Sequence, residues 1–381
     1  MLALRLALGS HPLVLLRRLM VAAASAGVGF LLLCTLTYAL SHPDESGTSG
    51  LRLLWCLIPL AATVQFAVAV ARTDPSARPR SGLSAVGLGP ARLAALSAVS
   101  TAVSGTLGSM VALLVFLYLR GDLTGLPFAG AAAELLAAGE PLPLAAALTL
   151  LTPVPLLASV AAALALRPRR TTAPPDAPAP APTGLPWGVA LMAAGLAAET
   201  YASRGGPGSP LPLPGEFDGN PAGVLTGWTL TALGLALAGP GITRLCGRLL
   251  QSLRPGPTRL LAGRILMEES TRIGRPLGVV CAVASGAIAA TSVYDGTPPD
   301  PLGPLTTLGA ALVMTCTTAT LLVSALESRQ SRAPTTAALR HLGTPAVTLR
   351  SAAALRAATL LAAFAPLTWA VAAVAAVPLS R

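Results

Sequence analysis

The sequence contains no lysine, because all 26 basic residues among its 381 residues are arginines. A Walker A loop needs a lysine on the nucleotide phosphates, and Schiff-base chemistry needs a lysine amine. The chain therefore cannot be its own P-loop ATPase, and we predict that it is not an enzyme. Charge is scarce as well: 11% of the residues are charged, against about a quarter in soluble globular proteins. This excludes the class of water-soluble enzymes.

Histidine and cysteine are also few. The three histidines lie far from one another in the sequence, and no two of the five cysteines form a C-x-x-C pair. Most of the cysteines stand in apolar runs, which favours buried small hydrophobic residues over disulfides or metal ligands. We expect neither a metal site nor a directly bound cofactor. The cysteines are Cys34, Cys56, Cys246, Cys281 and Cys316.

Apolar residues are abundant, at 53% of the chain. A helix needs about 20 mostly apolar residues to cross the hydrocarbon layer of a bilayer. Nine segments meet this requirement, which predicts an all-α polytopic membrane protein. The segments are 19–41, 53–71, 94–119, 144–166, 185–203, 222–243, 276–294, 304–326 and 357–379.

The arginines predict the orientation of these spans. With the N-terminus in the cytoplasm, 22 of the 26 arginines fall in cytoplasmic segments, as the positive-inside rule requires. We predict a multi-pass protein of the cell membrane with a cytoplasmic N-terminus and an external C-terminus. This location accounts for the formal charge of +11, so the expected partner of the arginines is the lipid bilayer and not nucleic acid.

The loops suggest how the chain is organised. The predicted outer loops, 42–52, 120–143, 204–221 and 295–303, are too short to form a sizeable extracellular domain. Within the second loop, residues 129–138 are expected to form a short helix at the membrane surface. Segment 167–184 is rich in proline and reads as a cytoplasmic linker. The expected parts are a first transmembrane unit (1–166), this linker, a connecting pair of spans (185–243) and a second unit (244–381).

One short pattern occurs twice. Leu83, Val86, Gly87 and Leu93 have counterparts at Leu339, Leu342, Gly343 and Leu349, all displaced by 256 residues. Both copies precede a long span, the third and the ninth. Spans 1–3 thus correspond to spans 7–9, and because six spans separate the copies the two repeats are expected to be parallel. Chance similarity between two alanine-rich segments is the alternative.

A motif of the form L-x-x-L/V-G, entered through arginines and leading into a transmembrane helix, resembles the FtsX-like (MacB-type) family of ABC transporter permeases. In that family such a stretch docks onto the partner ATPase. The small residues Gly105 and Gly108 in span 3 similarly resemble the start of the family's third helix, and small residues favour close helix packing. The residues that match the docking stretch are Arg78, Arg80, Leu83, Val86, Gly87 and Leu93 in the first copy and Arg332, Leu339, Arg340, Leu342, Gly343 and Leu349 in the second.

The resemblance implies a permease subunit whose partner, a separate ATP-binding chain, holds ATP and Mg²⁺. ATP hydrolysis there would drive export or extraction of an amphipathic or lipidic substrate, or signalling across the membrane. The permease would pair with a second permease or with a copy of itself. The chain departs from the family in two places: no extracellular domain separates its first two spans, and the second unit stops after three spans instead of four.

Other interpretations remain open. Gly87 and Gly343 would also suit the ends of interfacial helices, with the arginines anchoring the spans to anionic lipid. The chain would then be a secondary transporter coupled to ions or protons, or a membrane scaffold or sensor. Glu199 is the acidic residue that the predicted spans contain. It is either a functional intramembrane carboxylate or a surface carboxylate that pairs with Arg204.

Overall fold

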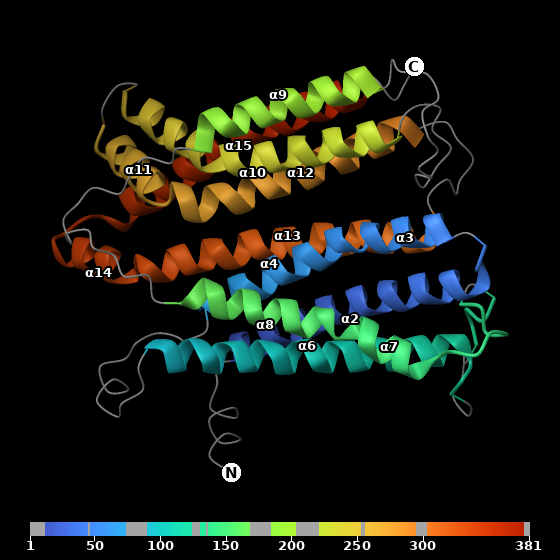
Figure 1. Ribbon diagram of the computed structural model, residues 1–381. Helices are drawn as coiled ribbons and strands as arrows, with labels where there is room; N and C mark the ends of the chain where they lie inside the picture. Colours follow the sequence, from blue (N-terminus) through green and yellow to red (C-terminus); the bar gives the residue numbers. More distant parts are fainter. Residues whose placement is uncertain are drawn as a thin grey trace, which may run out of the picture. The chain divides into compact units, whose positions relative to one another are not determined.

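The computed structural model describes residues 12–44, 46–73, 90–123, 130–134, 136–167, 184–202, 221–252, 256–294 and 303–376. Regular structure in these ranges is helical throughout (Figure 1). Alanine and leucine, which dominate the helices, are among the strongest helix formers. The chain forms two compact units, and α13 (Pro304–Ser331) contributes to both of them: Met1–Thr171 with Pro304–Cys316, and Thr172–Gly303 with Thr317–Arg381.

Eight helical segments are long and apolar enough to cross a membrane, counted over the described ranges alone. They coincide with eight of the nine predicted spans, so the chain has the architecture of an all-α multi-pass membrane protein. The remaining predicted span, 185–203, coincides with α9 (Gly184–Ala202), which is helical but is not among the eight segments that meet the hydropathy requirement for a spanning helix. Its three glycines, together with Glu199 and Tyr201, lower its mean hydropathy.

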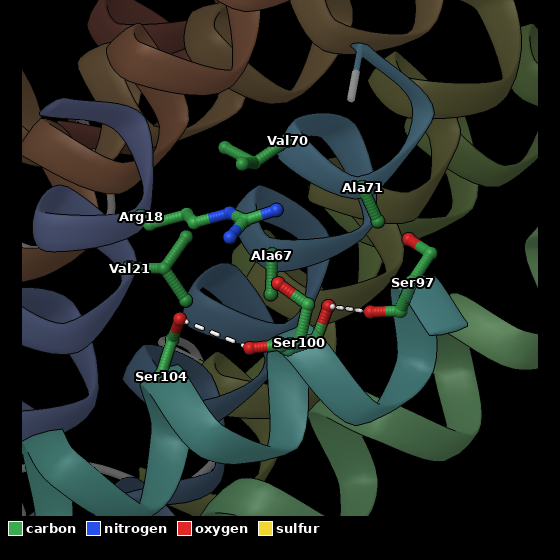
Figure 2. Close-up of a pocket in the computed structure, with 9 residues that line it drawn as sticks. Arg18, Val21, Ala67, Val70, Ala71, Ser97, Ser100 and Ser104 are labelled. Carbon is green, nitrogen blue, oxygen red and sulfur yellow. Dashed lines mark hydrogen bonds between the residues drawn. The ribbon is translucent and has the colours of Figure 1, made fainter. Parts of the chain in front are cut away.

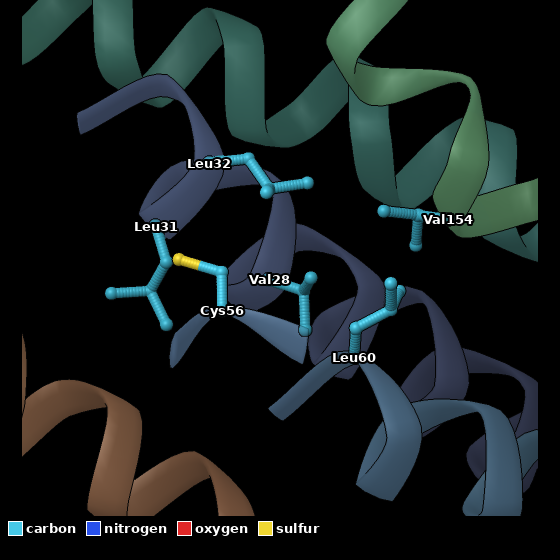
Figure 3. Packing of buried hydrophobic residues seen from close by; sticks show 6 residues of the cluster. All are labelled: Val28, Leu31, Leu32, Cys56, Leu60 and Val154. Atoms are coloured by element: carbon cyan, nitrogen blue, oxygen red, sulfur yellow. The ribbon is translucent and has the colours of Figure 1, made fainter. Parts of the chain in front are cut away.

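The first unit is built around α2. This helix (Pro12–Ser41) packs on α6 (Pro90–Arg120) and on α4 (Leu57–Thr73), and α8 (Pro153–Leu166) packs on both α6 and α4. Figure 3 shows one of the buried clusters that hold these helices together; it comprises Val28, Leu31, Leu32, Cys56, Leu60 and Val154. All five cysteines are buried and free of disulfides, as their apolar surroundings predicted.

Two of the predicted spans in this unit are interrupted. The second is divided into α3 (Ser46–Trp55) and α4, with the break at Cys56. The fourth is divided into α7 (Leu144–Leu151) and α8, with the break at Thr152. Pro153 accounts for the second break, because proline lacks the N–H of an interior helical residue and suits the first position of a new helix.

The described residues of the second predicted outer loop do not form the expected surface helix. The described residues of 130–140 form turns, and Gly130 and Ala137 have positive φ values of 82° and 47°. An α-helix requires negative φ, so the prediction for 129–138 is wrong. The turns are held by the buried Arg120, which donates to the carbonyl of Glu140 and lies 3.4 Å from the carboxylate of Asp122.

The second unit is built around α10 (Pro221–Ser252). This helix packs against α9, α11 (Pro257–Glu268), α12 (Ser270–Tyr294) and α15 (Ala346–Ala376), and α12 packs against α15. In the sequence, α13 and α14 (Ala333–His341) lie between α12 and α15. The predicted division of the chain into two units, a linker and a connecting pair stays a prediction.

Glycines set the spacing between α9 and α10. A β-carbon on Gly188 would lie 2.7 Å from the carbonyl oxygen of Gly234, and one on Gly195 would lie 2.6 Å from that of Gly227. These distances leave no room for a side chain. The glycines recur every seven residues on both helices, which keeps them on one helical face and lets the backbones approach closely.

Candidate coupling site

The second copy of the repeated motif forms a bend between two helices. We call residues 332–350 the coupling elbow. α14 begins directly after Arg332, its last helical residue is His341, and α15 starts at Ala346. The motif therefore occupies the end of one short helix and the entry into a long, apolar one that can span a membrane.

The geometry of the elbow explains its glycine. The backbone N–H of Thr344 donates to the carbonyl of Leu339 at 3.1 Å, and that of Gly343 donates to the carbonyl of Arg340 at 3.0 Å. This pair of bonds is the Schellman arrangement that ends a helix. Gly343 has φ of +87°, a left-handed conformation that other residues adopt only with strain. The glycine thus ends the helix, as the alternative interpretation of the motif proposed.

The outer face of the elbow is open. No residue of α14 is buried, and the apolar side chains of Leu342 and Val347 are 83% and 73% exposed. Arg340 and Arg350 are exposed beside them. Exposed leucine and valine flanked by arginines suit contact with a partner protein and equally suit the headgroup region of a bilayer.

Ion pairs connect the inner side of the elbow to the rest of the unit. Arg332 forms an ion pair with Glu269, at the junction of α11 and α12, and also donates to the hydroxyl of Ser328 at 3.2 Å. Arg356 of α15 lies 4.0 Å from the same carboxylate. Burial raises the pKa of Glu269, and the positive charge of Arg332 opposes that shift. The cluster of Arg332, Glu269 and Arg356 connects the elbow to α12 and α15, and we call it the anchor.

The structure places the predicted residues of the second copy in different surroundings. Leu342, Arg340 and Gly343 are exposed at the tip of the elbow, whereas Leu339 and Leu349 are half-buried. The first copy lies outside the described residues at Arg78, Arg80, Leu83, Val86 and Gly87; Leu93 belongs to α6 by its backbone.

Sequence reasoning missed the partners of Arg332. Glu268 and Glu269 form the acidic pair in the arginine-rich segment 244–275, which the arginine distribution predicts to be cytoplasmic. A carboxylate in such surroundings suggests an ion pair, and that signal was available. Arg356 offered no comparable signal, because it lies in a run of alanines and leucines.

The two glycines of span 3 lie at helix contacts. A β-carbon on Gly108 would stand 2.3 Å from the carbonyl oxygen of Ala22 on α2. One on Gly105 would stand 3.0 Å from the Cα of Pro155 on α8. Both positions therefore require a residue without a side chain at the observed helix separation.

Glu199 is not a surface carboxylate. Its side chain is 1% exposed and lies in the contact of α9 with α10, where its Cγ would be 2.5 Å from a β-carbon on Gly227. The Thr231 hydroxyl faces the carboxyl, yet no described group completes a hydrogen bond to either carboxylate oxygen. The predicted partner Arg204 lies outside the described residues. A buried acidic group of this kind in an apolar helix pair is costly and is typical of functional positions.

Comparison with protein-family models, with curated proteins and with solved structures yields no match to this chain.

Proposed function

We propose that the chain is the permease subunit of an ABC transporter. It receives mechanical work from ATP hydrolysis on a separate nucleotide-binding subunit and moves an amphipathic or lipidic substrate, or a signal, across the cell membrane. The single observation that carries this proposal is the coupling elbow. Its tip presents Leu342 and Val347 to a partner, and its base is fixed to the rest of the unit by the anchor.

The anchor suggests how movement would spread from the elbow. α15 continues directly from the elbow, so a displacement of the tip moves the first turns of that helix. Glu269 stands one residue before α12, and its ion pair with Arg332 transmits the same displacement to α12. Because α12 and α15 also pack on each other, the two helices would shift together as one body.

The repeat supports the same proposal. In the first unit, the helices of the first and third predicted spans, α2 and α6, pack together; in the second unit, so do those of the seventh and ninth, α12 and α15. In each unit, the first and third spans of the repeat pack together, and an arginine-rich motif precedes the third span. This arrangement suits a permease in which each unit makes one contact with an ATPase. We infer that residues 78–93 provide the contact of the first unit.

An amphipathic substrate suits the outer side of the chain. The predicted outer loops are short, and the described part of the second one is a set of turns over Arg120 rather than a binding domain. A substrate that dissolves in the bilayer reaches the helices directly and needs no such domain.

The test is purification of the tagged chain in mild detergent, followed by mass spectrometry and an ATP hydrolysis assay. We expect a chain with the Walker A sequence G-x-x-x-x-G-K-S/T to co-purify, and we expect the purified sample to hydrolyse ATP. Leu342→Glu should remove both, since it places charge at the docking surface. Leu260→Glu is the matched control: Leu260 is a 44% exposed leucine of α11 in the same unit but outside the elbow. Equal effects of the two variants, or no ATPase with the wild type, would refute the proposal.

One observation favours a second candidate, a proton-coupled secondary transporter: Glu199 is buried, and no described residue donates a hydrogen bond to its carboxylate oxygens by geometry. For that function, an imposed proton gradient should drive transport in vesicles without nucleotide, and Glu199→Gln should abolish it. Transport that requires ATP and survives Glu199→Gln would exclude this candidate.

A further inference from the structure

Two polar side chains occupy gaps that glycines leave in the contact between α9 and α10. A β-carbon on Gly227 of α10 would lie 2.5 Å from the Cγ of Glu199. One on Gly195 of α9 would lie closer still to the hydroxyl oxygen of Thr231. At the glycine contact seven residues away, by contrast, the nearest atoms of the opposite helix all belong to the backbone. Each helix therefore leaves room at this one level for a polar side chain of the other.

Neither polar side chain completes a hydrogen bond. The side chain of Glu199 is 1% exposed, and by geometry neither of its carboxylate oxygens has a hydrogen-bond partner among the described residues. The same holds for the hydroxyl oxygen of Thr231. A buried polar group without a partner is costly, so packing alone does not explain this pair.

Buried hydroxyls on α6 show the usual arrangement (Figure 2). There the hydroxyl of Thr101 donates to the carbonyl of Ser97 at 2.9 Å. The hydroxyl of Ser104 likewise donates to the carbonyl of Ser100 at 3.1 Å. Such a bond to a carbonyl one turn earlier satisfies a hydroxyl inside a helix pair, and the hydroxyl between α9 and α10 lacks it.

The helices around Glu199 bring it no positive charge. α9 packs mainly on α10 and also touches α15, and the first half of α10, where Glu199 packs, contains no charged residue. Apart from Glu199, the charged or titratable residues of these three helices are Tyr201, Arg244, Cys246, Arg248, Arg350 and Arg356. The arginines among them lie in the second half of α10 or belong to the elbow and the anchor.

A protonated carboxyl suits these surroundings, whereas an ionised one does not. A carboxylate withdrawn from water is costly unless a cation or several donors surround it, and the described residues offer a single hydroxyl. A neutral carboxyl brings its own O–H donor, and the hydroxyl of Thr231 can rotate to accept a hydrogen bond from it. The arrangement is therefore that of a site for a proton.

The site lies at an end of α9 that can reach water. Glu199 is in the last turn of the described helix, which ends at Ala202. Tyr201 is 81% exposed, and exposed tyrosine is typical of the boundary between membrane and water. Because α9 packs mainly on one helix, a small separation of this end from α10 would bring the carboxyl into contact with water.

We propose that Glu199 and Thr231 form a proton-binding site between α9 and α10, in which the bound proton stabilises the helix contact and its release weakens that contact. Glu199 holds the proton, and Thr231 positions the carboxyl. The inference goes beyond the proposed function, because it requires neither an ATPase nor transport driven by a proton gradient.

The first test is reaction of the purified full chain with dicyclohexylcarbodiimide, an apolar reagent for protonated carboxyls. The carboxyl transfers its proton to one nitrogen of the reagent while its oxygen bonds to the central carbon, and the acyl group then moves to nitrogen to give a stable acylurea. Near neutral pH, Glu199 should be labelled at least about tenfold faster than the reference carboxyls. These are Glu268, which is 66% exposed, and Glu269, which is paired with Arg332. Mass spectrometry of peptides measures all three in one sample.

The second test asks whether the proton stabilises the contact. Thermal unfolding is compared between the wild type and Glu199→Gln, whose amide resembles the neutral carboxyl, from about pH 5 to about pH 9. A carboxyl that holds its proton more strongly in the folded chain contributes stability at low pH and loses it as the pH rises. The unfolding temperature of the wild type should therefore fall by several degrees relative to the variant as the pH rises. Glu268→Gln, the exposed control, should show no such change.

Three results would overturn the proposal. One is labelling of Glu199 no faster than that of Glu268, and another is a difference between the wild type and Glu199→Gln that does not change with pH. The third is protection of Glu199 from the carbodiimide by sodium ions, relative to choline at equal ionic strength, since the ligand would then be a metal cation. Neither experiment uses nucleotide, a partner chain or a substrate, so failure here is separate from failure of the proposed function.

Discussion

The anchor permits a quantitative prediction about the coupling elbow. Replacing Glu269 or Arg332 with glutamine removes one member of their ion pair. The side chains are 10% and 21% exposed, so the pair is shielded from water but not fully buried. Two unit charges about 4 Å apart attract by about 4 kcal/mol at an effective dielectric constant near 20. Because the two side chains are partly exposed, water screens part of this attraction, and we expect a coupling energy of about 2 kcal/mol between Glu269 and Arg332.

A double-mutant cycle isolates that energy. The free energy of unfolding is measured in mixed micelles for the wild type, Glu269→Gln, Arg332→Gln and the double variant. Each single change should be destabilising, because it leaves a largely buried charge without its main partner. The double variant should be less destabilised than the sum of the two, with the difference equal to the coupling energy.

The chain offers a matched control for this cycle. Arg264 and Glu268 are four residues apart on α11, 3.7 Å from each other, and their side chains are 79% and 66% exposed. A solvent-exposed pair of this type contributes about 0.3–0.5 kcal/mol. If the Arg332 and Glu269 changes were additive within about 0.5 kcal/mol, like those of the control pair, the anchor would not fix the elbow and the reasoning would be refuted.

Two further predictions concern glycines. Gly343→Ala should destabilise the chain by about 1–2 kcal/mol, from backbone strain at positive φ alone, since its β-carbon would have no atom within 4 Å. Gly256→Ala, with equally open surroundings at φ of −107°, should not be destabilising in the same thermal assay. Gly108→Ala should lower the free energy of unfolding by about 1–3 kcal/mol, because the added methyl group forces α6 away from α2. Gly286→Ala, in open space on α12, should leave the free energy of unfolding unchanged or raise it. Equal unfolding temperatures within either pair would contradict the corresponding prediction.

Much of the fold could be predicted from the sequence because the membrane imposes a strong and simple requirement. Twenty apolar residues in a row have few alternatives to a spanning helix. Helix ends were less predictable: α10 continues to Ser252, beyond the predicted limit of 243, and α15 begins at Ala346, before the predicted 357. Their polar extensions are helical by propensity and packing, which a hydropathy criterion does not detect.

The candidate site could be predicted only in part. The glycine of the repeated motif indicated a helix end, and Gly343 is one. The burial of Glu199 depends on which face of α9 meets α10, and hydropathy alone does not indicate that face. The glycines spaced by seven residues on both helices were the signal for that contact. The surface helix expected at 129–138 is replaced by turns, because Gly130 has a positive φ and the loop folds over Arg120, which donates to the carbonyl of Glu140.

The most direct test of the central claim is a cross-link from the tip of the elbow. A photoreactive residue is placed at Leu342 in cells that make the full chain, and the cross-linked partner is identified by mass spectrometry. Leu260, also exposed in this unit, serves as the reference position. The proposed function predicts that Leu342, but not Leu260, cross-links to a protein with a Walker A motif, and that ATP changes the yield. A partner without that motif, or equal yields from both positions, would contradict it.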